Sequence, residues 1–294
     1  MGAAGFVSEP AMAFSGNGRA LVARANAHPA LGDDPQVVLS RRTLDGTYRT
    51  ARTVTGPVGG QPPRLVAYGE TRAALLRVLP QRGEPSDSHK VRVGISFGRT
   101  DGDIEPFRAL DSYRRAPRVP VLDAVPAAMA AGDDGRIAIA YVESRPGAGD
   151  LLWLTVRAPG ERFERCVVRG SGRISDLVLD VGDGGDVAVA YRRDERIEAR
   201  VQRSGHSLGR VEDLGPAQPV ATLDVSMATS GRVAVAWGSY ATDGASRAPL
   251  AVRAALRPPG PRRFGAAQTL SEEAQRPGAA QEPPSRSPRR RMAP

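Results

Sequence analysis

One short phrase occurs five times along this chain of 294 residues, and the repetition constrains the fold more than any other feature. The copies are GRALVAR at Gly18, TRAALLR at Thr71, GRIAIAY at Gly135, GDVAVAY at Gly185 and GRVAVAW at Gly231. Their starts lie 53, 64, 50 and 46 residues apart. Self-similarity at a spacing near fifty residues indicates one supersecondary unit used several times.

Each phrase follows another short apolar run, and glycine-rich segments such as GNG, GDDG and GDGG separate the two. Turn residues that tolerate positive φ between two apolar runs predict a tight antiparallel hairpin. A second pair of runs follows in every repeat, and its turn contains Gly46, Gly102, Gly160, Gly205 or Gly260. The sequence therefore predicts four antiparallel strands per repeat.

The second strand of each repeat has two apolar faces. RIAIAY from Arg136 and RVAVAW from Arg232 place β-branched residues on one face and alanine on the other. A sheet that is covered on both faces needs this pattern. We therefore predict an all-β fold, a β-propeller of about five four-stranded blades, with a β-sandwich or irregular barrel as the alternative. Six residues are predicted to be buried between blades: Val187, Val189, Val233, Val235, Ile137 and Ile139.

The predicted propeller spans residues 1–271, with repeats at about 9–55, 62–111, 125–170, 175–215 and 221–271. Residues 2–8 resemble residues 265–271, so we expect them to form an orphan outer strand. The sequence allows two alternatives, a propeller of five blades or an incomplete six-bladed ring. Unpaired sheet edges would allow self-association. Residues 272–294 are rich in proline, serine and arginine and predict a disordered basic tail.

The net charge is +9, from 41 basic and 32 acidic residues, and every basic residue except Lys90 is arginine. The arginines are spread along the chain without a stripe of aromatic partners, so nucleic-acid binding is not expected. The longest apolar run, Ile137 to Val142, is far shorter than the roughly 18 residues of a membrane span. The first thirty residues carry no signal-peptide pattern, so an extracellular location would require a start upstream of Met1.

No pattern indicates a metal or a cofactor. The acidic turns, such as GDGGD at Gly182, lack the spacing of a calcium loop, and Asp-Gly hairpin chemistry accounts for them. The three histidines lie far apart in the sequence. Cys166 lies in a predicted outer strand and is expected to be a small buried residue. We predict neither a metal site nor a bound cofactor.

An apolar pair, a glycine turn, a phrase such as VAVAW at Val233, a variable loop and a second glycine turn make up each repeat. This arrangement resembles the β-propeller repeats of secreted proteins from GC-rich bacteria, which are similar to the sialidase-like propeller superfamily. The resemblance covers roughly residues 2–271 and includes TLDGTY at Thr43, which looks like an Asp box, a folding element of sialidases. Sialidase chemistry would also need an arginine triad, a tyrosine with a glutamate partner and an acidic residue. No local spacing identifies that set here.

The long, variable loops all fall at the end of the propeller opposite the short glycine turns, and binding residues tend to lie on such loops. Candidate binding residues on this long-loop face are Tyr113, Arg114, Arg115, Arg118, Tyr240, Asp243 and Arg247. The leading hypothesis is a non-catalytic propeller scaffold that binds a protein or glycan through this face, with no catalytic residues assigned. The alternative is a sialidase-like glycoside hydrolase.

Overall fold

The computed structural model describes residues 6–7, 10–27, 36–43, 45–54, 63–81, 89–115, 125–145, 148–217, 220–240 and 249–272. All elements within these ranges are β-strands. The first sheet contains β1 (Phe6–Val7), β2 (Ala11–Phe14), β3 (Ala20–Ala27), β4 (Gln36–Arg42) and β5 (Tyr48–Val54). The second contains β6 (Arg64–Tyr68), β7 (Arg72–Gln81), β8 (His89–Arg99) and β9 (Arg108–Arg115). The third contains β10 (Ala127–Ala131), β11 (Ile137–Glu143), β12 (Leu151–Arg157) and β13 (Glu164–Val168).

The last two repeats form sheets of the same kind. The fourth sheet contains β14 (Ile174–Val181), β15 (Val187–Arg193), β16 (Arg196–Gln202) and β17 (Glu212–Pro216). The fifth contains β18 (Val220–Met227), β19 (Val233–Tyr240), β20 (Pro249–Arg257) and β21 (Gln268–Glu272). Neighbouring strands are antiparallel throughout, and four strands per repeat are confirmed.

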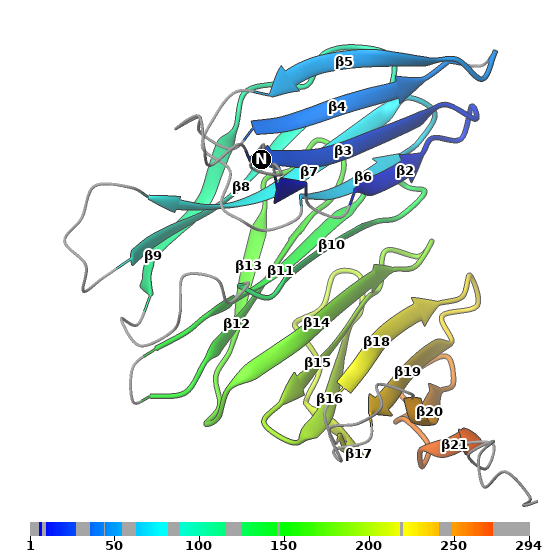
Figure 1. Cartoon of the computed structure of the whole chain (residues 1–294). Helices are drawn as coiled ribbons and strands as arrows, with labels where there is room; N and C mark the ends of the chain where they lie inside the picture. The colour runs from blue at the N-terminus through cyan, green and yellow to red at the C-terminus, as the bar shows by residue number, and fades with distance from the viewer. Residues whose placement is uncertain are drawn as a thin grey trace, which may run out of the picture.

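Five such sheets are the blades of a β-propeller, as the sequence predicted. They follow one another from the first sheet at the top of Figure 1 to the fifth at the bottom. The first strands of successive sheets contact one another, in the series β2, β6, β10, β14 and β18. Among the described residues, no strand of the first sheet shares more than isolated contacts with a strand of the fifth.

The predicted core is confirmed, because all six residues expected between the blades are buried. The fourth sheet shows how both faces of one strand are used. Val187 and Val189 pack into a cluster with the third sheet, whereas Ala188 and Ala190 pack into a cluster with the fifth. Burial of apolar surface on both faces stabilises this blade through its two neighbours.

The glycine turns close the hairpins in the predicted way. Gly185 and Gly231 have φ values of 78° and 76°, a region that glycine enters without a Cβ clash. The Asp-box-like segment also forms a local turn. Asp45 accepts hydrogen bonds from the Thr43 hydroxyl and, at 3.0 Å, from the backbone N–H of Thr47. These bonds, led by the one from Thr43, lower the pKa of the Asp45 carboxyl.

The N-terminal segment requires a correction. Phe6 and Val7 form β1 and pair with Ala27 and Asn26 of β3, on the edge where β2 also pairs. The prediction of an outer strand is therefore wrong for these two residues. β3 is eight residues long and β2 pairs with only its first half, so the second half offers free backbone groups that β1 takes up.

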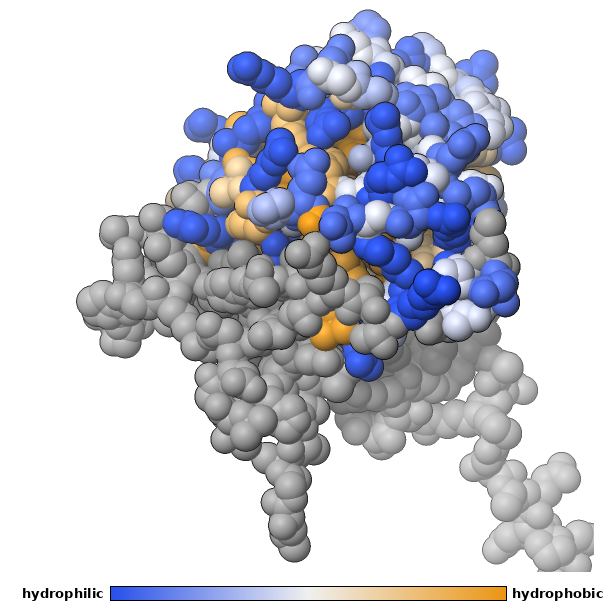
Figure 2. All heavy atoms as spheres, turned by 90° about the horizontal axis from the view of Figure 1, so that it is seen from above, coloured by the Kyte–Doolittle hydropathy of each residue, from blue (hydrophilic) through white to orange (hydrophobic). Residues whose placement is uncertain are grey.

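The remaining parts of the predicted terminal segments lie outside the described residues. Of the predicted basic tail, only Glu272 is described, and it pairs with Ala251 at the end of β21. The surface seen from above is mostly hydrophilic, with patches of apolar side chains between the charged ones (Figure 2). In the ranges given above, no helix is long and apolar enough to cross a membrane.

Candidate functional site

A basic pocket of about 160 Å³ lies between the outer parts of the fourth and fifth sheets. Its lining comes from the end of β16, the start of β17, the end of β20 and the connections that follow β16 and β20. The lining residues are Val201, Gly209, Arg210, Glu212, Arg257, Pro261, Arg262 and Arg263. We refer to this set as the arginine pocket. Four arginines against one glutamate give it a strong positive charge.

Arg257 and Glu212 form the buried part of the arginine pocket. The Arg257 Nε lies 3.8 Å from Glu212 Oε1, and its Nη2 donates to the Gly260 carbonyl at 3.1 Å. Glu212 Oε2 accepts the backbone N–H of Phe264 at 2.8 Å, so both of its oxygens have partners. Burial lowers the pKa of Arg257, and the Glu212 charge opposes this effect. The pair fixes the turn after β20 against β17.

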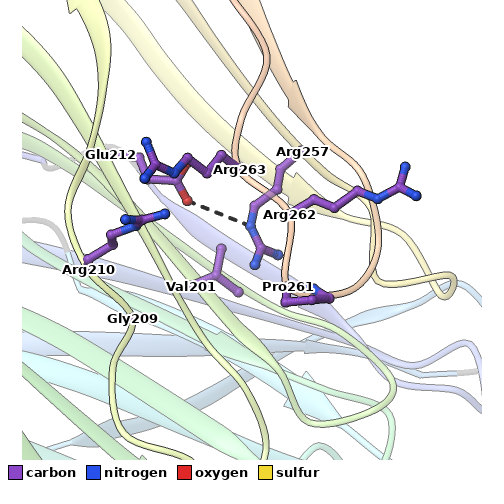
Figure 3. Close-up of a pocket in the computed structure, with 8 residues that line it drawn as sticks. All are labelled: Val201, Gly209, Arg210, Glu212, Arg257, Pro261, Arg262 and Arg263. Carbon is purple, nitrogen blue, oxygen red and sulfur yellow. Dashed lines mark ion pairs between the residues drawn. The ribbon is translucent and has the colours of Figure 1, made fainter.

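The other three arginines are exposed. Arg210 and Arg263 lie beside Glu212, whereas the Arg262 side chain extends away from it (Figure 3). Guanidinium groups donate several hydrogen bonds in a planar fork that matches carboxylate, sulfate and phosphate oxygens. The arginine pocket can therefore bind an anionic group, and its lining offers no unpaired carboxylate that could act as a base.

Local sequence explains how these arginines come together. The segment RPPGPRRF ends β20 and turns at Gly260, which has a φ of 89°. Gly209 donates its backbone N–H to the Val201 carbonyl at 3.0 Å and places Arg210 at the corresponding turn of the fourth sheet. Since these turns lie at the same end of adjacent sheets, Arg210 and Arg263 come to line one cavity.

The sequence did not identify the arginine pocket, which lies at the short-turn end and not on the long-loop face. Arginines are so frequent here that no single one stands out. The one available signal was the Arg262–Arg263 pair shortly after the turn glycine Gly260, with Arg210 shortly after the turn of the preceding repeat. Only the packing of the two sheets shows that these positions share one cavity.

The candidates on the long-loop face stay a prediction. The backbones of Tyr113, Arg114 and Arg115 end β9, and that of Tyr240 ends β19. These strand ends belong to the second and fifth sheets, and the side chains lie outside the described residues. The remaining three candidates, Arg118, Asp243 and Arg247, lie wholly outside them.

A second polar cluster ties the second sheet to the third. The Tyr141 hydroxyl donates to Asp111 Oδ2 at 2.8 Å, and Arg165 Nη2 donates to the same carboxylate oxygen at 2.6 Å and to the Tyr141 oxygen at 2.7 Å. The Trp153 ring stacks on Tyr141, and the Arg165 guanidinium lies over the Trp153 ring. Burial, aided by Asp111, raises the pKa of Tyr141. These groups satisfy one another, so the cluster is an interblade tie.

Cys166 lies in β13 and is partly buried, and its burial raises the pKa of the thiol. It donates to the Leu154 carbonyl at 3.5 Å, as a small packed residue would. In the part of the chain that the structure describes, no three His, Cys, Asp or Glu side chains lie close enough to hold a metal ion.

The chain matches no known family model and no curated protein. Among solved structures, it is similar to a protein of unknown function from Dyadobacter fermentans. The two share 15% identity over 90% of this chain and 94% of that chain, with a TM-score of 0.55. An α-L-arabinofuranosidase from Fusarium graminearum shares 10% identity over 90% and 93%, with a TM-score of 0.47. A thermostable family-43 glycoside hydrolase shares 12% identity over 92% and 98%, with a TM-score of 0.45.

An identity of 15% at a TM-score of 0.55 shows a common fold alone. The five successive antiparallel sheets confirm the propeller part of the sequence resemblance, whereas its sialidase-like part stays a prediction. The fold and the site together define a five-bladed β-propeller with an arginine-lined pocket between its last two blades.

Proposed function

We propose that this protein is a non-catalytic propeller scaffold that binds an anionic group of a glycan or protein ligand in the arginine pocket. The observation that supports the proposal is a cavity lined by the exposed Arg210, Arg262 and Arg263, with Arg210 and Arg263 beside its one carboxylate, Glu212, which already has partners. An incoming anion would meet exposed guanidinium donors, and the neighbouring Glu212 already has Arg257 and the Phe264 N–H as partners. Carboxylates, sulfates and phosphates share the chemistry that these donors recognise.

The sialidase-like alternative would need more than arginines. A retaining mechanism of that kind uses a nucleophile with a carboxylate partner and a separate acid. The lining of the arginine pocket contains no tyrosine, and its one carboxylate is paired with Arg257 and the Phe264 N–H. These features support binding over hydrolysis at this place.

Isothermal titration with inorganic sulfate, sulfated and uronic oligosaccharides, glutamate-rich peptides and neutral oligosaccharides tests the proposal. We expect binding of the anionic probes only, weakened at least about tenfold in the double variant R262A/R263A because charge-assisted hydrogen bonds are lost. R162A is the matched control, since Arg162 is exposed and follows the turn glycine of the third sheet. Equal binding by R262A/R263A, or equal affinity for neutral probes, would contradict the pocket assignment.

Two further arms separate the remaining hypotheses. If the long-loop face carries the binding, then R114A/R115A weakens it and R262A/R263A does not. Sialosides and aryl glycosides test catalysis. Hydrolysis above buffer that is lost on replacing a single tyrosine or glutamate would overturn the non-catalytic assignment.

A further inference from the structure

Each sheet of the propeller has two faces that are used in a fixed order. The leading face points to the preceding sheet and the trailing face to the following one. In the fifth sheet, Val233 and Val235 belong to the leading face and pack on Ala188 and Ala190 of the trailing face of the fourth. The other three interfaces between successive sheets are built in the same way, leading face on trailing face.

Among the described residues, no other sheet covers the leading face of the first sheet, although Ala20 in β3 is itself buried. Met12 lies opposite Val22, and Phe14 lies opposite Ala20, in β2 and β3. Met12 and Phe14 lie in a regular strand on the face that points away from the second sheet. Although both side chains are apolar, Met12 is 50% exposed and Phe14 is 61% exposed.

Register shows what these positions become when a neighbour is present. In the fifth sheet, Val225 lies opposite Val235 and Met227 opposite Val233, so these two residues correspond to Met12 and Phe14. Both are buried against the fourth sheet. The first sheet therefore presents the side chains of an interblade contact without the blade.

The trailing face of the fifth sheet is open in the same sense. Leu256 lies opposite Ala234 in β19 and is 53% exposed. Its counterpart in the fourth sheet, Val201, lies opposite Ala188 and is buried where the fifth sheet covers it. The two open faces also carry opposite charges at exposed positions, Arg24 beside Val22 and Asp224 opposite Ala236.

We propose that the leading face of the first sheet binds the trailing face of the fifth sheet of a second copy of this chain. Every other leading face in the molecule is covered by a trailing face, and one trailing face of the same construction is left over. Within the part of the chain that the structure describes, the two faces do not cover each other, because their strands share at most isolated contacts and Met12, Phe14 and Leu256 stay exposed. Four continuous apolar clusters hold the intervening sheets in place.

Such a contact joins two different surfaces, so it is heterologous. Copies then associate head to tail, and the assembly either closes into a ring or grows with concentration. Sedimentation velocity of the full chain over a concentration series measures this directly. We expect a weight-average mass that rises from the 31.1 kDa of a single chain. A mass that stays at this value at every concentration would overturn the proposal and leave closure of the ring within one chain.

Complementary variants test which faces meet. M12E/F14E removes the leading face and L256E removes the trailing face, so each alone should remain at the mass of one chain. Mixed together, they keep one intact face each and should form a one-to-one pair that stops at two chains. V211E is the control, because Val211 is an exposed apolar residue outside both faces.

Two outcomes of the sedimentation experiments would contradict the head-to-tail arrangement. Association of L256E alone would show that two leading faces pair with each other and would contradict the head-to-tail arrangement. A mixture that stays at the mass of one chain would contradict it as well. Circular dichroism checks that the strands are retained, and M12S/F14S with L256S replaces the glutamate variants if either of them unfolds.

Discussion

The first and fourth sheets are built from the same phrase and end in different environments. In the fourth, Val189 on one face and Ala190 on the other are both fully buried, because a sheet packs on each side. In the first, Leu21 is buried against the second sheet, whereas Val22 on the opposite face remains partly exposed. The repeat therefore encodes a strand with two apolar faces, and each face is buried only where a neighbouring sheet packs on it.

The largest expected effect comes from a charge placed at the fifth residue of the phrase. V235D puts an unpaired carboxylate into the contact between the fourth and fifth sheets, and we expect a loss of roughly 3–5 kcal/mol in the free energy of unfolding. V22D changes the equivalent residue of the first sheet and should cost less than about 1 kcal/mol in a single chain, because water reaches that face.

Urea unfolding at low protein concentration measures both variants of this pair. Equal losses in V235D and V22D would break the comparison between a covered and an open face. A cost for V22D that grows with protein concentration would sharpen it, since the face would then be covered by another copy.

The last residue of the repeated phrase should make the free energy of unfolding depend on pH. It is Tyr191 in the fourth sheet, where burial, with a contribution from the Glu198 charge, raises the pKa of the hydroxyl to about 12 from 10.0. The stability that the neutral phenol contributes is complete below pH 10 and is lost as the pH rises through about 12. The loss should amount to roughly 2–3 kcal/mol.

Urea unfolding at several pH values between 9 and 12, an interval set by the unfolded and folded pKa of Tyr191, measures this loss. Y191F should remove part of the decline, because Phe cannot ionise. The equivalent residue of the first sheet is Arg24, which is exposed. R24M should therefore leave the decline unchanged. A decline of the same size in Y191F would rule out Tyr191 as its source.

The smallest effect concerns Arg77, the last residue of the phrase in the second sheet. It is fully buried, with Nε and Nη1 lacking hydrogen-bond partners, a 3.3 Å bond from Nη2 to Ser96 and the Phe107 ring 4.8 Å from its guanidinium carbon. Burial lowers the pKa of this guanidinium. Replacing a poorly satisfied buried cation with an apolar residue of similar length removes a desolvation penalty.

We therefore expect R77M to raise the free energy of unfolding by about 1 kcal/mol. R24M, the same change at the exposed equivalent position, should have no measurable effect. Thermal unfolding of both variants gives the comparison. A clear loss of stability in R77M would mean that the guanidinium contributes more through Ser96 and Phe107 than its desolvation costs.

The strands, their number per repeat and the buried side of each were predictable because these depend on short-range patterns. Alternation in VAVAY at Val187 and VAVAW at Val233 specifies a pleated strand with two apolar faces. Gly185 and Gly231 specify the turns that pair it with its neighbour. Each of these signals is complete within about ten residues, so neither depends on where the rest of the chain lies.

The arginine pocket and the open faces were decided only by the tertiary structure. Phe264 donates to Glu212 across 52 residues of sequence, and no local pattern connects them. In the same way, the sequence gives Phe14 and Met227 equivalent roles, and only the position of the sheets leaves one exposed and the other buried. The same is true of β1, whose sequence resembles an outer strand and whose place was set by the free half of β3. The physical reason is that a strand pattern fixes which side chains share a face, whereas the surface that covers this face belongs to residues far away in the chain.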